Sequence, residues 1–343
     1  MKGFIYFYYL CINFYKMINS VRNTVLAVAN KQNFGYISPA DFNLYAKQAQ
    51  LDIFEDYFYR YNEWMVKQNS RVSGSGYADI VKNLEEVIDL FSVQNSLYRV
   101  NPPSGISMIG NLYNMPNETN NDDTYYLLNK VLVYKNILTE GATTGVTVGN
   151  NGVVDTNKDF VSLGVSVGDY VAIQVGDRMF FERINGIVGT DTLNVSNTNI
   201  SSSSSVYSIY EANTIQKEVE RVSHSKITML NSSNLTSPKL NTPAYTQSEL
   251  TISVFPSTID AVGQVTAQYI RKPRDPKWTY TSLSGGEPAF DQGSTDYQDF
   301  ELPITDEPNL VNKILKYAGI SIREADVYQT ASNEEIKEAQ KQG

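Results

Sequence analysis

The spacing of apolar residues changes near residue 96, and this change constrains the fold more than any other feature of the chain. Before it, apolar side chains recur every three or four residues, which is the period of an amphipathic helix. After it, short β-branched runs alternate with prolines, asparagines and glycines, which is typical of strands and turns. The sequence therefore predicts an α+β fold that begins with a helical module.

One helix of this module has a clear predicted start at Pro39. Ser38 offers an N-cap hydroxyl, proline suits the first helical position, and Asp41 places an acid in the first turn. A helix from Pro39 to Gln68 would be about 45 Å long. Its apolar residues form two stripes, so we expect burial on more than one side, either within the subunit or between subunits. The first stripe contains Phe42, Tyr45, Ala46, Ala49, Ile53, Tyr57, Tyr61 and Trp64, and the second contains Leu44, Leu51, Phe54 and Phe58.

Apolar periodicity predicts further helices of ordinary length. They cover residues 20–30, 218–230 and 307–317, and the last is followed by a polar helical tail over residues 323–342. Another helix follows the glycines near residue 75 and carries Ile80, Leu84, Val87, Ile88 and Phe91 on one face. A solvated tail with few apolar residues is often ordered only by a partner.

Turn signals divide residues 138–210 into short strands. Asn151-Gly152, Gly176-Asp177 and Asn185-Gly186 are pairs that favour tight turns. The strands expected between them cover residues 146–148, 170–175, 179–184 and 193–195. This spacing predicts a small antiparallel β-barrel or sandwich, which we call the β module. Strands at 125–134, 249–255 and 264–270 should complete one core around it, which makes the β module an insertion.

The predicted organisation therefore has six parts. They are a non-native or flexible extension (1–16), the helical module (17–95), a strand and loop region (96–137), the β module (138–210), a return segment whose strands complete the core (211–306), and C-terminal helices with a tail (307–343).

The extension carries an apolar run from Phe4 to Tyr15. This run is shorter than the span of about 20 residues that crosses a bilayer, and no small-residue cleavage site follows it. We expect translation from an upstream start, with Met17 as the natural beginning. The alternative is an apolar arm that inserts into a neighbouring subunit.

The chain offers little material for catalysis or metal binding. Its single cysteine, Cys11, and single histidine, His224, exclude an intramolecular disulfide and a Cys/His zinc cluster. His224 lies in a polar segment, so we expect a surface residue rather than a catalytic base. Residues 155–159 resemble the start of a calcium loop, but Phe160 occupies the position of the turn glycine, so we predict a simple turn. We predict no catalytic residue, no metal and no cofactor; a carboxylate-based hydrolase is a weaker alternative.

The charge balance argues against a nucleic-acid-binding protein, because 28 Lys and Arg against 37 Asp and Glu give a net charge of −9. One basic segment, residues 269–278, combines four cations with prolines and a tryptophan. It either meets acidic groups on a neighbouring subunit or is a solvated strand exit. The candidate interface residues are Phe54, Phe58, Arg271, Arg274 and Trp278.

Several stretches resemble virion ring proteins of crAss-like bacteriophages. They are residues 21–25, 33–43, 46–50, 230–238, 269–273, 276–278, 300–302 and 310–315. The resemblance implies a structural virion protein without catalytic activity, which forms a closed ring, a dodecamer, around the tail or the portal-proximal connector. Portal, other ring and tail proteins would be its partners. It would be made in the host bacterial cytoplasm and would reside in the virion tail. The family provides no site residues to transfer.

A ring needs two different complementary faces on each subunit. The sequence suggests the aromatic helix from Pro39 for one face and the segment around Arg271, Arg274 and Trp278 for the other. The alternative function is a glycan-binding tail or surface module. Exposed aromatic residues that form a platform within residues 170–210 would favour that alternative.

Overall fold

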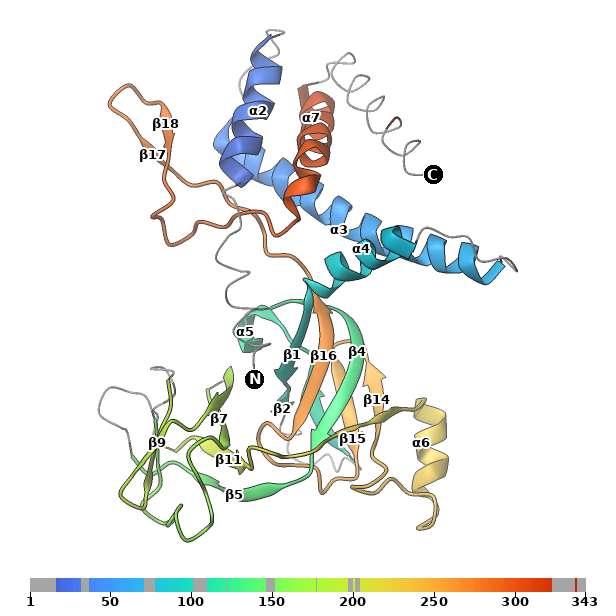
Figure 1. Cartoon of the computed structure of the whole chain (residues 1–343), viewed down its shortest axis with the longest axis vertical. Coiled ribbons are helices and arrows are strands. Elements are labelled where there is room, and N and C mark those ends of the chain that lie inside the picture. The colour runs from blue at the N-terminus through green and yellow to red at the C-terminus, as the bar shows by residue number, and fades with distance from the viewer. Residues whose placement is uncertain are drawn as a thin grey trace. The chain divides into compact units, whose positions relative to one another are not determined.

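The computed structural model describes residues 17–31, 37–70, 78–100, 110–121, 123–145, 152–176, 178–196, 200, 204–322 and 337. Helices and antiparallel sheets confirm the predicted α+β class (Figure 1). The chain divides into two compact units. The helical unit combines Met1–Leu90 with Pro273–Gly343, and the β unit is Phe91–Lys272.

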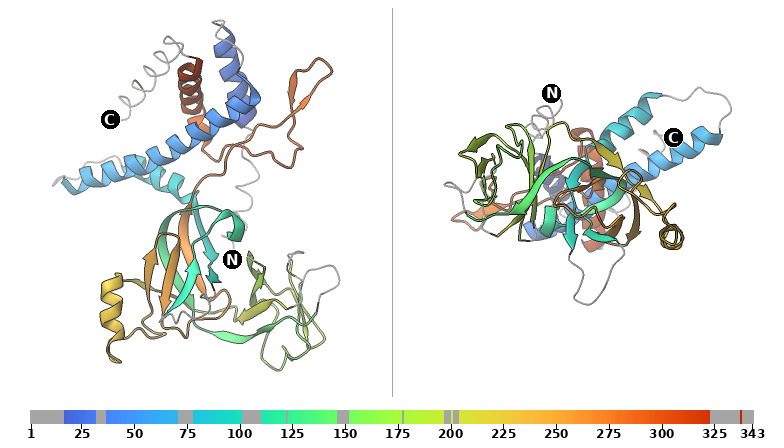
Figure 2. Two further views of the ribbon diagram at one scale, coloured as in Figure 1. Left: turned by 180° about the vertical axis from the view of Figure 1, so that it is seen from behind. Right: turned by 90° about the horizontal axis from the view of Figure 1, so that it is seen from below.

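The helical unit is built on the long helix α3 (Pro39–Ser70), which starts at the predicted proline. The Ser38 hydroxyl accepts a hydrogen bond of 3.1 Å from the Asp41 backbone amide, as expected for an N-cap. Helix α7 (Glu307–Ile322) packs against both α2 (Met17–Lys31) and the middle of α3, and α4 (Ala78–Asp89) lies along the C-terminal half of α3 (Figures 1 and 2). A 3-10 turn, Ile304–Asp306, leads into α7.

A β-hairpin completes the helical unit. Its strands, β17 (Tyr280–Ser282) and β18 (Pro288–Phe290), extend away from the helices (Figure 1). The predicted polar tail beyond Ile322 lies outside the described residues, apart from Lys337.

The β unit contains a sandwich of two sheets. One sheet has the order β1 (Ser92–Ser96), β16 (Val265–Arg271), β4 (Tyr125–Tyr134) and β12 (Gln216–Glu218). The other has the order β13 (Glu220–Arg221), β14 (Ala244–Ser248), β15 (Thr251–Phe255), β3 (Asn111–Asn114) and β2 (Tyr98–Val100). A short helix, α5 (Glu118–Asn121), lies between β3 and β4 in the chain.

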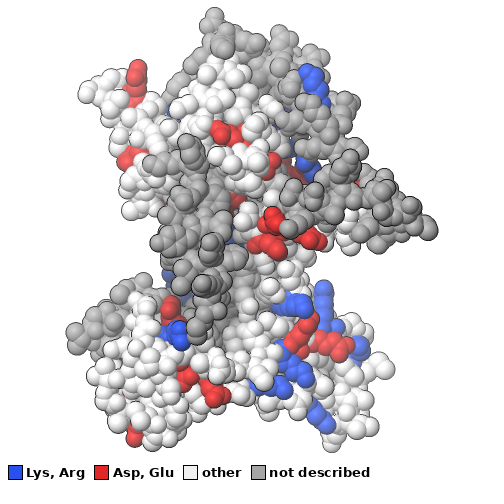
Figure 3. Space-filling model, in the orientation of Figure 1, with Lys and Arg blue, Asp and Glu red and all other residues white. Residues whose placement is uncertain are grey.

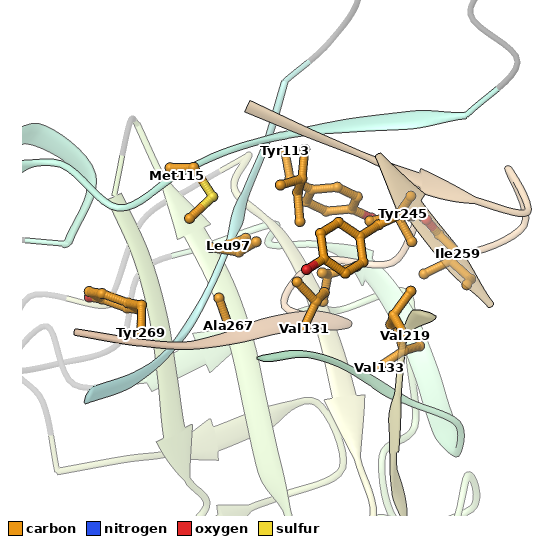
Figure 4. Packing of buried hydrophobic residues seen from close by; sticks show 13 residues of the cluster. Leu97, Tyr113, Met115, Val131, Val133, Val219, Tyr245, Ile259, Ala267 and Tyr269 are labelled. Carbon is orange, nitrogen blue, oxygen red and sulfur yellow. Dashed lines mark hydrogen bonds between the residues drawn. The ribbon is translucent and has the colours of Figure 1, made fainter. Parts of the chain in front are cut away.

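Side chains from both sheets form one apolar core (Figure 4). The buried residues are Leu97, Tyr113, Met115, Val131, Val133, Val219, Tyr245, Ile252, Val254, Ile259, Val265, Ala267 and Tyr269. Residues on alternate positions of β4 and β16 point into this core, as the period of two in a strand requires.

The β module leaves the sandwich after β4 and returns to it at β12. These two strands are direct neighbours, and Gln216 pairs with Tyr134. The module contains one sheet of β5 (Ile137–Ala142), β11 (Val206–Tyr210), β7 (Tyr170–Val175) and β8 (Arg178–Arg183). A second sheet contains β6 (Gly152–Val154), β10 (Thr192–Asn194) and β9 (Gly186–Val188). Within the described residues these sheets are open and do not close into a barrel. The strand predicted at 146–148 lies outside the described residues.

Stacked aromatic rings join the β module to the sandwich. Phe181 of β8 stacks on Tyr134 of β4 with 5.3 Å between ring centroids, and Tyr170 stacks on Phe181 at 5.5 Å. Tyr210 lies 5.7 Å from Phe181, and its hydroxyl donates a hydrogen bond of 2.6 Å to the Val262 carbonyl. The module is therefore packed against its host.

Two predicted helices differ from the structure. Phe91 does not belong to α4, which ends at Asp89; it is buried in the β unit, and strand β1 follows it. The helix predicted over 218–230 is shorter, because its first residues pair with β4 and β14 as β12 and β13. The remaining helix, α6 (His224–Asn231), starts after Ser223, whose hydroxyl accepts a hydrogen bond from the Lys226 amide.

Candidate interaction surfaces

Trp278 lies inside the core of the helical unit, so its prediction as an interface anchor is wrong. Only 2% of the residue is exposed. The indole stacks on Tyr280 and Phe290 of the hairpin, with ring centroids 5.7 and 5.9 Å apart, and the Arg22 guanidinium lies 3.7 Å from its ring centre. Its proline-rich neighbourhood suggested an exposed segment, but that segment crosses α2 and α3 and buries the ring between them.

Polar side chains from two helices hold the Trp278 segment in place. Asn43 of α3 accepts a hydrogen bond of 2.9 Å from the Trp278 amide and donates one of 3.2 Å to its carbonyl. Asn19 of α2 accepts from the indole nitrogen at 3.1 Å. Every polar group of Trp278 is therefore satisfied within its own unit.

The other predicted interface residues differ in burial and in the unit to which they belong. Phe54 is buried with 1% exposed, and its ring packs edge-on against the half-buried Phe58 at 5.0 Å. Arg274 belongs to the helical unit and has an exposed side chain, and Arg271 belongs to the β unit. The Nε atom of Arg271 lies 3.7 Å from Asp123, and its side chain is 15% exposed. The boundary between the two units at Pro273 divides the basic segment that the sequence presented as continuous.

Two tyrosines, the buried Tyr57 and the half-buried Tyr317, instead attach α3 to α7 and its preceding turn. The Tyr57 hydroxyl donates to Asp306, and the Tyr317 hydroxyl donates to Asp52. Burial, together with the nearby Asp306 carboxylate, raises the pKa of Tyr57 far above its usual range. Burial also raises the pKa of Asp306, against the opposing effect of the Tyr57 hydrogen bond. These aromatic residues of α3 are structural.

The outer face of α3 carries an exposed stripe of acidic and apolar side chains. Glu55, Tyr59, Glu63 and Val66 follow one another at intervals of three or four residues, so they share one face of the helix. Tyr59 and Val66 are each 68% exposed. We call these four residues the acidic stripe. None of the four residues lies on the two apolar stripes of this helix, so its apolar period does not indicate the acidic stripe.

The β unit carries a basic face, which Figure 3 shows as a group of blue side chains around α6 and the neighbouring sheet edge. The basic face has six cations: Lys130, Lys135, Lys217, Arg221, Lys226 and Lys239. Lys135 and Lys217 both hydrogen-bond to Asn241, and Lys239 pairs with the neighbouring Thr242. Two acids lie among them: Glu218 is 3.1 Å from Lys130, and Glu220 is 3.4 Å from Lys226. The cations come from β4 and the residue after it, from β12, β13 and α6, and from the loop after α6, so no local sequence pattern could reveal them.

The residues considered above as a catalytic base or as calcium ligands form hydrogen bonds within the fold. The Nε2 atom of His224 lies 3.3 Å from the Gln247 carbonyl and 3.3 Å from the Ser248 hydroxyl, on an exposed surface. Asp155 accepts a hydrogen bond of 2.7 Å from the Tyr207 hydroxyl and one of 3.0 Å from the Asn157 amide. The predicted turn at residues 155–159 is therefore confirmed. In the described part of the chain, no group of three or more His, Cys, Asp and Glu residues is placed to hold a metal ion.

The aromatic residues of the β module do not form the exposed platform that glycan binding would require. Tyr207 and Tyr210 are buried, and Tyr170 and Phe181 are half-buried in the stack against the sandwich. Burial raises the pKa of Tyr207 and Tyr210 well above the usual range. These rings serve packing.

No helix among the described residues is both long enough and apolar enough to cross a membrane. A scan against protein-family models and a search of curated proteins found no match for this sequence.

Proposed function

We propose that this chain is a structural subunit of a bacteriophage virion, one copy of a ring in the tail or the portal-proximal connector. One observation carries the proposal. Most of the stretches that resemble ring proteins of crAss-like phages belong to the helical unit and meet in its core. Asn43 and Trp278, which are in contact there, are 235 residues apart in the sequence.

Contacts between these stretches define that core. Arg22, from the stretch 21–25, covers the indole of Trp278, from the stretch 276–278. Asn43, at the end of the stretch 33–43, forms two hydrogen bonds with the same tryptophan. Gln50 accepts a hydrogen bond of 3.0 Å from the Glu301 amide, which joins the stretches 46–50 and 300–302. The resemblance therefore concerns a folded unit and not isolated surface motifs.

Exposed apolar side chains on projecting elements support a role in assembly. Tyr59 and Val66 lie on the long helix α3, and Leu283, which is 56% exposed, lies at the hairpin tip. Tyr59 and Val66 share one face of α3, and exposed apolar groups gathered on one surface commonly mark a site of contact with another protein. A subunit of this kind acts by binding its neighbours and needs no reactive group.

Electron microscopy and native mass spectrometry of the full-length protein test the proposal. We expect closed rings of uniform size, with twelve copies as the resemblance implies. A chain that stays monomeric at every protein concentration, or that a virion reconstruction places as a monomeric fibre tip, would contradict it.

A further inference from the structure

We infer that the basic face of the β unit binds the acidic stripe of the helical unit of a second copy of this chain. The inference rests on the proposed ring, because a head-to-tail contact must join two different surfaces of the same subunit. The basic face and the acidic stripe would be those two surfaces, held together by opposite charges and by apolar side chains.

The first observation is the excess of positive charge on the basic face. Its six cations and two acids leave four uncompensated positive charges in a chain whose net charge is −9. The ion pairs Lys130–Glu218 and Lys226–Glu220 are both exposed by more than half, so they neutralise the face only weakly. Such a face attracts an acidic partner and fixes its orientation.

Apolar side chains accompany these cations. Met229 on α6 is 73% exposed, and Leu235 and Leu240 on the following loop are 86% and 38% exposed. A surface of this composition suits a protein partner that offers both acids and apolar groups. A polyanion would use only the cations.

The acidic stripe offers that combination. Glu55 and Glu63 alternate with Tyr59 and Val66 along one helical face. The surrounding residues are also acidic, since residues 52–70 of α3 and residues 78–89 of α4 contain six acids besides Glu55 and Glu63, against three cations. The sign of the charge and the presence of exposed apolar groups therefore match the basic face.

Charge reversal tests the inference by analytical ultracentrifugation of the full-length protein. We expect Arg221→Glu with Lys226→Glu to weaken assembly by at least about tenfold, and Glu55→Lys with Glu63→Lys to do the same. The matched control for reversal of the basic face is Lys47→Glu with Lys277→Glu, which changes two exposed lysines of the helical unit. It imposes the same charge change as Arg221→Glu with Lys226→Glu and should leave assembly intact. Thermal unfolding of every variant verifies that each subunit is folded.

Mixing the two reversed variants identifies the contact as intermolecular. In an alternating ring every junction would again join opposite charges, so an equimolar mixture should assemble although neither variant does so alone. A chain that carries all four reversals should also assemble. If assembly returns only in the chain that carries all four reversals, and not in the mixture, the contact lies within one chain and the inference is wrong.

Other outcomes separate this inference from the proposed function. If the wild-type protein forms rings and neither reversal affects them, the inference is wrong and the ring remains. If the wild-type protein never assembles, both fail. The wild-type protein could also bind double-stranded DNA. If reversal of the basic face abolishes that binding and leaves assembly unchanged, the basic face binds a polyanion and the inference is wrong.

Discussion

Trp278 is held by residues from the N-terminal helices, more than 200 positions away in the sequence. Arg22 and Asn19 of α2 contact it from one side, and Asn43 of α3 fixes its backbone. A large aromatic ring that contacts three elements contributes both apolar burial and hydrogen bonds to the unit. Its role is to join α2, α3 and the hairpin.

We predict that Trp278→Ala lowers the free energy of unfolding of the helical unit by about 3–5 kcal/mol, because it leaves a cavity and unpaired polar groups. Trp278→Phe should cost less, since it keeps the stacked ring and loses only the bond to Asn19. Denaturant unfolding measures both. An alanine variant of unchanged stability with weakened assembly would restore the interface assignment that burial now contradicts.

Gly263 is a second residue whose identity the fold requires. It has a φ of +70° and lies at the junction with the β module, where an added Cβ would be 2.3 Å from the Cβ of Ala172. Both atoms belong to rigid positions close to the backbone, so neither can rotate away.

We therefore expect Gly263→Ala to lower the melting temperature of the β unit more than Gly176→Ala does. Gly176 has a similar φ of +61°, and an added Cβ there meets nothing within 4 Å, so it isolates the cost of the left-handed backbone, which is about 1 kcal/mol. Differential scanning calorimetry of the two variants gives the comparison. Equal losses would show that the steric contact with Ala172 is unimportant.

At the scale of elements, the start of α2 depends on a distant carboxylate. Asp299 accepts hydrogen bonds of 2.9 and 2.8 Å from the Met17 and Ile18 amides, and one of 2.8 Å from its neighbour Phe300. These bonds satisfy amides that a helix cannot satisfy itself. Burial nevertheless raises the pKa of Asp299 above its ordinary value of 3.8, against the opposing effect of the three amides.

We predict that Asp299→Ala lowers the free energy of unfolding by about 1–3 kcal/mol through the loss of this cap. Asp299→Asn serves as the matched control, because it keeps one accepting oxygen and cannot titrate. A raised pKa means that the folded state binds the Asp299 proton more tightly than the unfolded state. The associated stability is present below the ordinary pKa and is lost as the pH rises through the folded-state value.

The free energy of unfolding of the wild type, minus that of Asp299→Asn, should therefore decrease as the pH rises above about 4. Chemical denaturation at a series of pH values measures this difference. An increase over the same range would show that the amide hydrogen bonds outweigh burial and that the pKa is lowered.

At the scale of the whole molecule, the β module is bracketed by neighbouring strands. Because Tyr134 of β4 pairs with Gln216 of β12, a short connection can replace everything between them. The aromatic stack around Phe181 is the main packing that such a replacement would remove.

We predict that a chain in which a short Gly/Ser linker replaces residues 138–210 still shows one cooperative unfolding transition for its sandwich. Tyr134→Thr in the shortened chain should improve solubility, because the Tyr134 ring would lose its stacking partner Phe181 and become exposed. Circular dichroism melts measure the unfolding transition of both variants, and the protein concentration left after centrifugation measures their solubility. A product without a cooperative transition would mean that the β module is an integral part of the core.

Local patterns in the sequence determined where many elements begin and what type they are. Pro39 starts α3 because a hydroxyl cap and a fixed φ act within one helical turn, and the strand predicted at 125–134 is β4 as observed. These signals rely on hydrogen bonds and periodicities that extend over only a few residues.

Only the tertiary structure decided which side chains are exposed and which are buried. The sequence around Trp278 is typical of an interface anchor, but segments more than 200 residues away bury this residue (|i−j| = 235 to Asn43). Arg271 and Arg274 belong to one basic run of the sequence, but the boundary at Pro273 assigns them to different units. The six cations of the basic face come from positions between Lys130 and Lys239 that no local pattern connects. Exposure and charge clustering depend on packing between distant segments, and that packing is a property of the folded chain as a whole.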